Sequence, residues 1–302
     1  MRLLPTLCLD PAVAERPRAC ADRLASYGYH AISVHCKQRP RLRVTVENLK
    51  DACCADANKW FDNEKIREVR DDGVSLGKIR LEAATGQNFS PHVDIPEPDG
   101  IMERARQLVL HLAQEHPAGR WEQFLTTDGA ALRWAESVIV SVSRTNIAGI
   151  WVAFFQGCQQ QSCGQGISHG STTAARFAKH QELNRVVLFS GPRDQFDSWH
   201  GFPSATPTER YFAFTHVEDG GWPDHYARSW SMLGLGEHGD LEDVTQLPAP
   251  YNGSRTLIST ADVGGDAGVA HTTVVPGGSS GKDEEGGYIY EDAWRYLFCA
   301  AA

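Results

Sequence analysis

A Gly-x-Ser-x-Gly pattern at residues 166–170 is the part of the chain whose residue types and spacing most directly suggest chemistry. The pattern, GISHG, places Ser168 between two glycines. In a sharp turn from a strand into a helix, glycines at these positions avoid collisions, and the serine hydroxyl stands clear of the backbone. A helix-type run begins at Ser171 and a strand-type run follows at 185–190. We therefore predict that Ser168 is a nucleophile.

A serine hydroxyl is a weak nucleophile at neutral pH, so it requires a base, and the base requires an acid that orients it. Of the 12 histidines, His271 alone follows the last predicted strand, at 256–259. We expect it on a loop beyond the carboxyl end of that strand. His271 is therefore the predicted base.

Two aspartates are candidates for the orienting acid. Asp219 follows the predicted strand at 211–216, and Asp194 follows the predicted strand at 185–190. Either residue could instead simply form a turn, because aspartate next to glycine or proline is common in turns. We predict that Asp219 is the acid, with Asp194 as the alternative.

Apolar runs typical of strands alternate with runs of helical periodicity, which predicts an α/β fold. We expect one domain over residues 1–302, with a mostly parallel sheet and helices on both of its faces. The expected strands lie at 30–35, 138–141, 185–190, 211–216 and 256–259, after a short strand remnant at residues 3–4. The expected helices lie at 14–27, 101–112, 171–180, 224–235 and 291–299, with Asp99 as the N-cap of the second.

The composition excludes several classes of protein. A chain of 302 residues, of which 41% are hydrophobic, can bury a sizeable core without disulfides or a metal. Its net charge of −9 offers no basic surface for nucleic acid. No apolar run approaches the roughly 18 residues that a membrane-spanning helix requires.

Cysteine usage and the start of the chain leave the cellular compartment open. The eight cysteines show no CxxC pair and no zinc-like spacing, so free buried thiols are expected, with disulfides as the alternative. The first residues contain too short an apolar run for a signal peptide, which favours the cytoplasm for the chain as it stands. Secretion stays open if the N-terminus is truncated. Nothing in the sequence determines the oligomeric state.

Residues 166–295 resemble a little-characterised bacterial and fungal branch of the α/β-hydrolase superfamily. The segments that carry the resemblance are GISHGSTTAARFAKH, RVVLFSGPRDQF, TPTERYFAFTHVEDGG, AHTTVVPGG and AWRYLF, with a looser likeness in GYHAISVHC and FSPHVDIPEPDGIMERARQLVLHL. The resemblance implies a serine hydrolase and no cofactor. We expect the substrate to be a small-molecule ester. By the resemblance, Ser168, Asp219 and His271 match the nucleophile, the acid and the base, in the chain order of that superfamily. The resemblance does not fix the substrate, nor decide between an ester and an amide.

The start of the chain departs from that family's pattern. Relatives carry a turn similar to LPGTG after their first core strand, where a backbone N–H helps to bind the oxyanion; here the stretch reads LPTLC, without the glycines. We expect the N–H of His169 to serve as one oxyanion donor. Thr6 is the candidate for the second. We also expect the edge strands that usually come before this point to be missing.

A second departure lies at residues 142–165, which separate the predicted strand at 138–141 from the turn that holds Ser168. Without this segment the chain reads WAESVIVSGISHGSTTAARF, a strand that runs straight into the turn. Every valine codon begins with GT, and a glutamine codon can end in AG, so Val142 and Gln165 match the boundary letters of an intron. We hypothesise an aberrant insertion, from a retained intron or a gene-model error. The alternative is a real insertion, whose residues 147–155 form a strand or a lid helix.

Two other classes of function compete with the hydrolase. A metal site is one, because four side chains with ligand atoms lie close together in the sequence: His216, Asp219, Asp224 and His225. Their spacing matches no established metal motif, so we predict no metal. The other is a catalytically inactive, hydrolase-like binding module, which the lost glycines near Thr6 and the interrupted strand favour.

Overall fold

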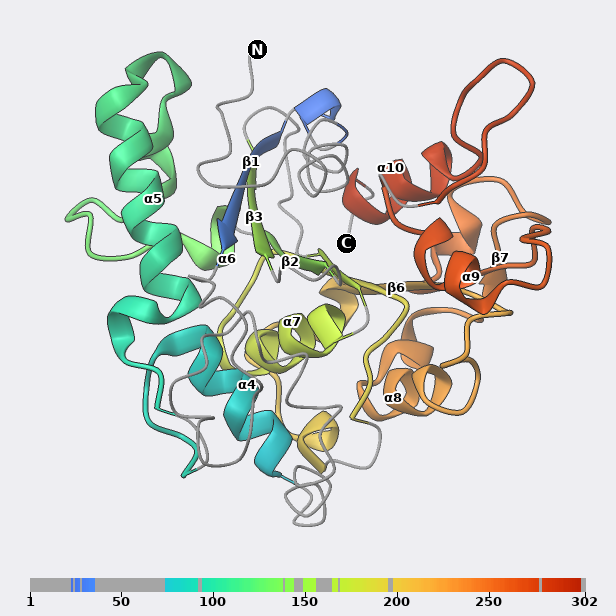
Figure 1. Ribbon diagram of the computed structural model, residues 1–302, viewed down its shortest axis with the longest axis horizontal. Coiled ribbons are helices and arrows are strands. Elements are labelled where there is room, and N and C mark those ends of the chain that lie inside the picture. Colours follow the sequence, from blue (N-terminus) through green and yellow to red (C-terminus); the bar gives the residue numbers. More distant parts are fainter. Residues whose placement is uncertain are drawn as a thin grey trace.

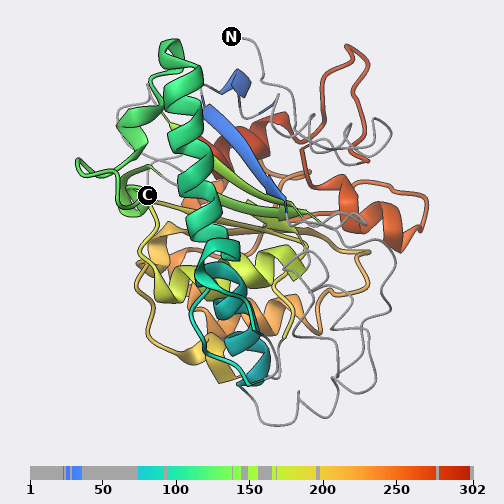
Figure 2. The same ribbon diagram turned by 60° about the vertical axis from the view of Figure 1, so that its left-hand side comes forward.

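A computed structural model describes residues 23, 25–27, 29–35, 74–91, 94–137, 139–143, 149–155, 165–167, 169–194, 198–276 and 279–299. Strands run through the middle of the molecule, and helices lie on either side of them (Figures 1 and 2). In the view of Figure 2, three helices lie below the strands: α4 (Ser75–Thr85), α7 (His169–His180) and α8 (Tyr226–Met232). The helix α10 (Glu291–Cys299) lies above them. This arrangement confirms the predicted α/β fold.

The main sheet is parallel throughout. Its five strands follow the order β4-β5-β6-β8-β7, and their bounds are Gln165–Ile167 for β4, Val186–Phe189 for β5, Tyr211–His216 for β6, Glu242–Asp243 for β7 and Thr256–Ser259 for β8. The predicted strands at 185–190, 211–216 and 256–259 are thus confirmed as β5, β6 and β8. The sequence did not indicate β4, which has three residues and is too short to show a pattern.

A second sheet is antiparallel, and its strands are arranged in the order β1-β3-β2. Its strands are β1 (Tyr29–His35), β2 (Ile139–Ser143) and β3 (Gly149–Phe155), with β3 paired to both of the others. β2 also contacts β4 and α7, so this sheet lies against the parallel one. The segment at 142–165 therefore contributes the last two residues of β2, all of β3 and the first residue of β4. Its origin as a retained intron or gene-model error stays a prediction.

Alternate side chains of the central strands enter different cores. In β5, Val186 and Leu188 belong to one hydrophobic cluster, while Val187 and Phe189 belong to the other. Successive side chains of a strand point to opposite faces of the sheet, so both faces of β5 are buried. All four of these residues are 0% exposed. The run VVLF is apolar throughout because neither of its faces meets water.

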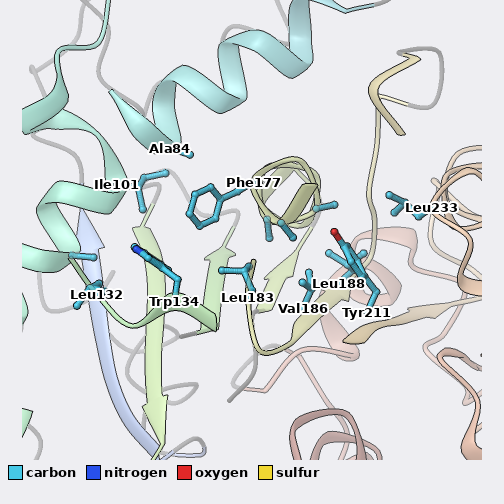
Figure 3. Packing of buried hydrophobic residues seen from close by; sticks show 14 of the residues in the cluster. Ala84, Ile101, Leu132, Trp134, Phe177, Leu183, Val186, Leu188, Tyr211 and Leu233 are labelled. Carbon is cyan, nitrogen blue, oxygen red and sulfur yellow. The ribbon is translucent and has the colours of Figure 1, made fainter. Parts of the chain in front are cut away.

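Helices of the first cluster cover one face of the sheet. They are α4 (Ser75–Thr85), α5 (Ile101–Glu115), α7 (His169–His180) and α8 (Tyr226–Met232). Figure 3 shows Phe177 of α7 pointing toward Ile101 and Ala84, while Val186 and Leu188 of β5 lie next to Tyr211 in the same cluster. α6 (Trp134–Ser137) contributes Trp134, whose ring contacts Phe177 edge to face, 5.3 Å between centroids.

The last helix, α10 (Glu291–Cys299), covers the opposite face. Its Trp294 is 0% exposed, and the indole N–H donates to the carbonyl of Val274 over 2.7 Å. Val274 is the C-cap of α9 (Ala267–Thr273), so α10 holds the end of that short helix in place. The predicted helix at 291–299 is confirmed, and α9 was not predicted.

Some expected boundaries were wrong, and others lie outside the described residues. Gly100 is the N-cap of α5, and Asp99 lies instead in the 3-10 turn before it. The predicted helix at 224–235 is shorter, because it ends at Met232 as α8. α4 was missed, because almost all of its residues are buried, charged ones included, so its sequence shows no apolar stripe. The strand at residues 3–4 and most of the helix at 14–27 fall outside the described residues, as do all cysteines except Cys299.

We expect Trp294→Ala to lower the free energy of unfolding by about 3–5 kcal/mol, because it empties a buried volume and leaves the Val274 carbonyl unbonded. Trp294→Phe should cost less, since it keeps most of the packing. Urea unfolding at neutral pH measures both. The control is Ile289→Ala, at a side chain that is 44% exposed. A cost for Trp294→Ala no larger than that of the control would contradict the expectation.

Candidate active site

Two of the residues that the sequence singles out, Asp219 and His271, follow the carboxyl ends of neighbouring parallel strands. In open α/β sheets this edge is where ligands bind, because the loops that leave the strands converge there. β4 ends at Ile167 and α7 begins at His169, with Ser168 between them in the chain. Asp219 follows β6, and His271 lies in α9, which follows β8. The order of these elements places three loops along one edge.

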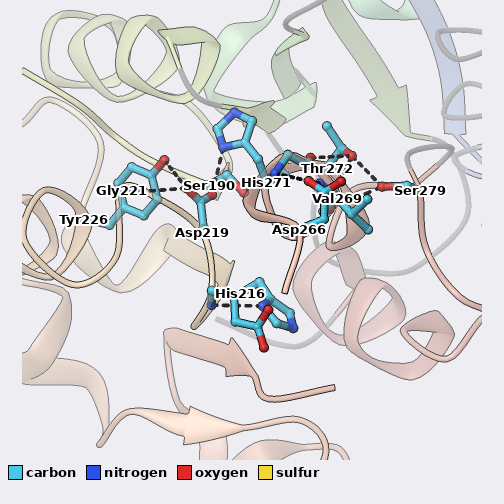
Figure 4. A network of polar contacts seen from close by, with 12 residues as sticks. Ser190, His216, Asp219, Gly221, Tyr226, Asp266, Val269, His271, Thr272 and Ser279 are labelled. Atoms are coloured by element: carbon cyan, nitrogen blue, oxygen red, sulfur yellow. Dashed lines mark hydrogen bonds and ion pairs between the residues drawn. The ribbon is translucent and has the colours of Figure 1, made fainter. Parts of the chain in front are cut away.

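Asp219 and His271 are in direct contact. The Nδ1 atom of His271 lies 2.8 Å from the Oδ2 atom of Asp219, within hydrogen-bond distance (Figure 4). Asp219 is 2% exposed and His271 is 7% exposed. The structure therefore brings the predicted base and the predicted acid together in a buried pair.

The contact determines which nitrogen of His271 carries the proton. An ionised carboxylate accepts hydrogen bonds only, so the Nδ1 atom must donate to Asp219. In the neutral ring, Nε2 then keeps its lone pair. That Nε2 atom is buried and has no hydrogen-bond partner in the described part of the chain. His271 thus offers a free, oriented nitrogen, which is what a general base needs.

Local structure at both ends of α9 fixes the backbone of His271. The Asp266 carboxylate caps the first turn by accepting from the N–H groups of Gly268 and Val269. The Ser190 hydroxyl, at the end of β5, donates to the carbonyl of His271 over 2.9 Å. The expectation that His271 lies on a loop was wrong, since an aspartate cap turns this stretch into a short helix.

Asp219 is held by two further donors. Its Oδ1 atom accepts from the N–H of Gly221 at 2.9 Å and from the hydroxyl of Tyr226 at 3.0 Å. Burial raises the pKa of Asp219, but the hydrogen bonds from His271, Gly221 and Tyr226 more than offset it, so the pKa lies below its ordinary value. Asp219 therefore stays ionised beside the imidazole.

The sequence did not point to Tyr226, but the glycine that makes room for it is visible there. A Cβ atom at Gly221 would lie 2.1 Å from Cζ of the Tyr226 ring, a distance that atoms cannot share. Glycine at position 221 is thus required for the tyrosine to reach Asp219. The Asp-Gly-Gly run at 219–221 was the available signal, although it also matches an ordinary turn.

Asp194, the alternative acid, has a different partner. Its carboxylate accepts from Arg80 of α4, with 2.6 Å to Nε and 3.1 Å to Nη2. The two side chains are 3% and 2% exposed, respectively. Arg80 also donates to the hydroxyl of Thr173 in α7, so it connects α4, α7 and the loop after β5. His271 is paired with Asp219 and not with Asp194.

The remaining predicted site residues are placed only in part. Ser168 and Thr6 lie outside the described residues. His169 is the first residue of α7. The nucleophile and the oxyanion donors therefore stay predictions.

Two of the residues considered for a metal site, His216 and Asp219, have other partners. Nε2 of His216 lies 2.7 Å from the carbonyl of Ala261, and its Nδ1 accepts from the N–H of Glu218. Asp219 is bonded to His271, Gly221 and Tyr226. Within the described ranges, no group of three or more His, Cys, Asp and Glu side chains is placed to hold a metal ion.

Comparison of the chain with protein-family models, with curated proteins and with solved structures gives no match. Among the helices that the structure describes, none has both the length and the apolar character needed to cross a membrane. Any statement about function must therefore come from the site itself.

We expect Tyr226→Phe to raise the pKa of Asp219, because the variant removes one donor to the carboxylate. A depressed carboxyl pKa adds stability at neutral pH, and this stability is lost as the pH falls through the folded-state pKa. In the variant, this contribution should be smaller at neutral pH, and its loss should be complete at a higher pH. Urea unfolding between neutral and acidic pH measures it.

The matched control for this prediction is Tyr290→Phe. Tyr290 is 1% exposed, and its hydroxyl lies 2.6 Å from the Ser259 hydroxyl, without a carboxylate partner. The Tyr290→Phe variant should be less stable than the unaltered protein at every pH, while the change of its stability with pH stays the same. If Tyr226→Phe also left the pH dependence unchanged, the tyrosine would not tune Asp219.

We expect Arg80→Met to lower the free energy of unfolding by about 3–5 kcal/mol, because it leaves the Asp194 carboxylate buried without its cation. Adding Asp194→Asn should recover a large part, since asparagine removes the charge and tolerates the left-handed backbone (φ 59°) at this position. Arg210→Met serves as the control, because its ion pair with Glu182 is exposed and should be worth about 1 kcal/mol or less. If the losses in the free energy of unfolding of Arg80→Met and Asp194→Asn add up to the loss of the double variant, the two side chains are not coupled and the expectation is wrong.

Proposed function

We propose that the chain is a serine hydrolase of the α/β-hydrolase type that cleaves carboxylic esters. The observation that carries the proposal is the buried Asp219–His271 pair, in which Nε2 of His271 has no partner among the described residues. The pair follows strands of the same parallel sheet in which β4 leads into α7. A histidine held by a carboxylate through Nδ1 is the arrangement that activates a hydroxyl nucleophile. Ser168 is the hydroxyl that the sequence offers at this point.

The chemistry follows from this pair. The Ser168 hydroxyl attacks the acyl carbonyl of the ester while Nε2 of His271 removes its proton. The imidazolium that forms is stabilised by the ionised Asp219 carboxylate. His271 then returns the proton to the departing alkoxide, which leaves an acyl-enzyme. Water, deprotonated by His271, releases the acid and restores the serine.

The start of α7 supplies a donor for the oxyanion. The first N–H groups of a helix have no partner within the helix, and the helix dipole makes this end positive. His169 is the first residue of α7, so its N–H is available to the negative oxygen of the tetrahedral intermediate. Thr6 remains the second candidate from the sequence.

Fluorophosphonate labelling tests the proposal, because the reagent captures an activated serine. We expect the protein to be labelled, Ser168→Ala to abolish labelling, and Asp219→Asn to slow it by about 10⁴-fold, since the amide holds the wrong imidazole tautomer. Ser229→Ala is a matched control that should leave labelling unchanged, because it removes a buried serine of α8 whose hydroxyl has no partner among the described residues. Labelling that survives Ser168→Ala would overturn the choice of nucleophile. No labelling in a folded protein would favour the inactive binding module.

The same labelling, with thermal unfolding, tests the segment at 142–165. In the structure this segment contains β3, the central strand of the antiparallel sheet. If the segment is aberrant, a chain without it should be at least as stable and should be labelled at Ser168, because residues 138–141 then lead straight into the turn. If the segment belongs to the fold, its removal should lower the melting temperature and the labelling together.

A further inference from the structure

Arg193 lies next to the Asp219–His271 pair, in the loop that follows β5. Its guanidinium carbon is 5.9 Å from the centroid of the Tyr226 ring, and the Tyr226 hydroxyl bonds Asp219. The backbone N–H of Arg193 donates to the hydroxyl of Thr172, in the first turns of α7, over 2.8 Å. One side chain thus separates Arg193 from the acid, and its backbone is fixed to the helix that follows Ser168.

The guanidinium of Arg193 has no carboxylate partner among the described residues. The neighbouring Asp194 is bonded to Arg80, and other arginines of the described chain pair with glutamates: Arg23, Arg106, Arg133, Arg210 and Arg295. The Nε atom of Arg193 is buried and makes no hydrogen bond. The guanidinium donates a hydrogen bond to the Tyr226 hydroxyl. Because a guanidinium carries five N–H donors, this bond and the contact with the Tyr226 ring still leave the Nε–H without an acceptor among the described residues.

Leaving such a group unbonded is unfavourable. A buried donor without an acceptor costs about 1–3 kcal/mol, and more if it is charged. Arg193 as a whole is only half-buried, so a molecule that enters this edge of the sheet can reach it. A ligand with an acceptor and a negative charge would satisfy both requirements of the guanidinium.

A second polar group without a hydrogen bond lies close to Arg193. His225, the N-cap residue of α8, has a buried Nδ1 atom without a hydrogen bond. Burial and then the charge of Arg193 lower the pKa of His225, so the two side chains are close enough to interact. Beside Asp219, the described part of the chain therefore presents a cation with one unbonded N–H, on Nε of Arg193, and one unbonded imidazole nitrogen, Nδ1 of His225.

We propose that Arg193 binds a carboxylate on the substrate, so that the preferred ester carries one negative charge away from the bond that is cleaved. This inference rests on the proposed function and names its substrate class: monoesters of dicarboxylic acids and similar anionic esters. A carboxylate fits better than a phosphate dianion, because one guanidinium supplies a single charge in a planar fork that matches two carboxylate oxygens.

Two matched esters test the proposal: mono-4-nitrophenyl glutarate, whose far carboxylate is free, and 4-nitrophenyl methyl glutarate, in which it is methylated. We expect the protein to prefer the anionic ester in kcat/KM. Arg193→Gln should lower kcat/KM for the anionic ester by about 10- to 100-fold, the range for a hydrogen bond to a charged group. It should change the value for the neutral ester less than twofold. Arg193→Lys should keep part of the preference.

The controls separate this inference from the proposed function. Arg295→Gln removes an arginine whose side chain is 62% exposed in α10 and should leave both rates unchanged. If both esters are cleaved equally well, or if Arg193→Gln slows both equally, the inference is overturned and Arg193 instead supports Tyr226 and Asp219.

A binding measurement decides the case in which neither ester is cleaved and fluorophosphonate does not react. That result would refute the proposed function. Calorimetric titration with monomethyl glutarate would then show whether the protein binds the anion through Arg193. Binding that Arg193→Gln weakens at least tenfold would support the anion site, while undetectable binding, or binding that the variant leaves unchanged, would overturn it.

Discussion

The buried carboxylate of Asp219 is the group on which the site depends. Removing an ionised carboxylate from water is costly, and the cost is met only if its oxygens are fully hydrogen-bonded. Three donors surround it: Nδ1 of His271, the N–H of Gly221 and the hydroxyl of Tyr226. Each comes from a different part of the chain, so the carboxylate couples the turn after β6, helix α8 and helix α9. The same bonds that make burial tolerable orient the imidazole.

The position of His271 is in turn determined by elements on both faces of the sheet. Ser190, at the end of β5, bonds its carbonyl, and Trp294 of α10 bonds the C-cap of its helix. The histidine is therefore supported by a strand end and by a helix of the opposite core. Such support restricts the ring to one orientation, which a base must keep through a reaction cycle.

Features that show as continuous apolar runs could be predicted from the sequence. Contacts between side chains that are far apart in the chain could not. β5, β6 and β8 are buried on both faces, so their residues read as apolar runs. The choice between Asp219 and Asp194 could not be made in this way, because each follows such a strand. It depends on Arg80, which is 114 residues away from Asp194 in the chain and shows no local pattern. Ser190 and Tyr226 escaped notice for the same reason.

Arg193 and Asp194 are neighbours in the chain, yet the fold separates their charges. Asp194 is bonded to Arg80 in a buried ion pair, which neutralises it and removes it as an acceptor for Arg193. Had the two neighbours paired with each other, the loop would carry no net charge toward the site. Because Arg80 takes the carboxylate, the positive charge of Arg193 stays uncompensated beside Tyr226 and His225. The buried pair thus does two things: it fixes α4 to α7, and it leaves the edge of the sheet with a cation that an anionic substrate can use.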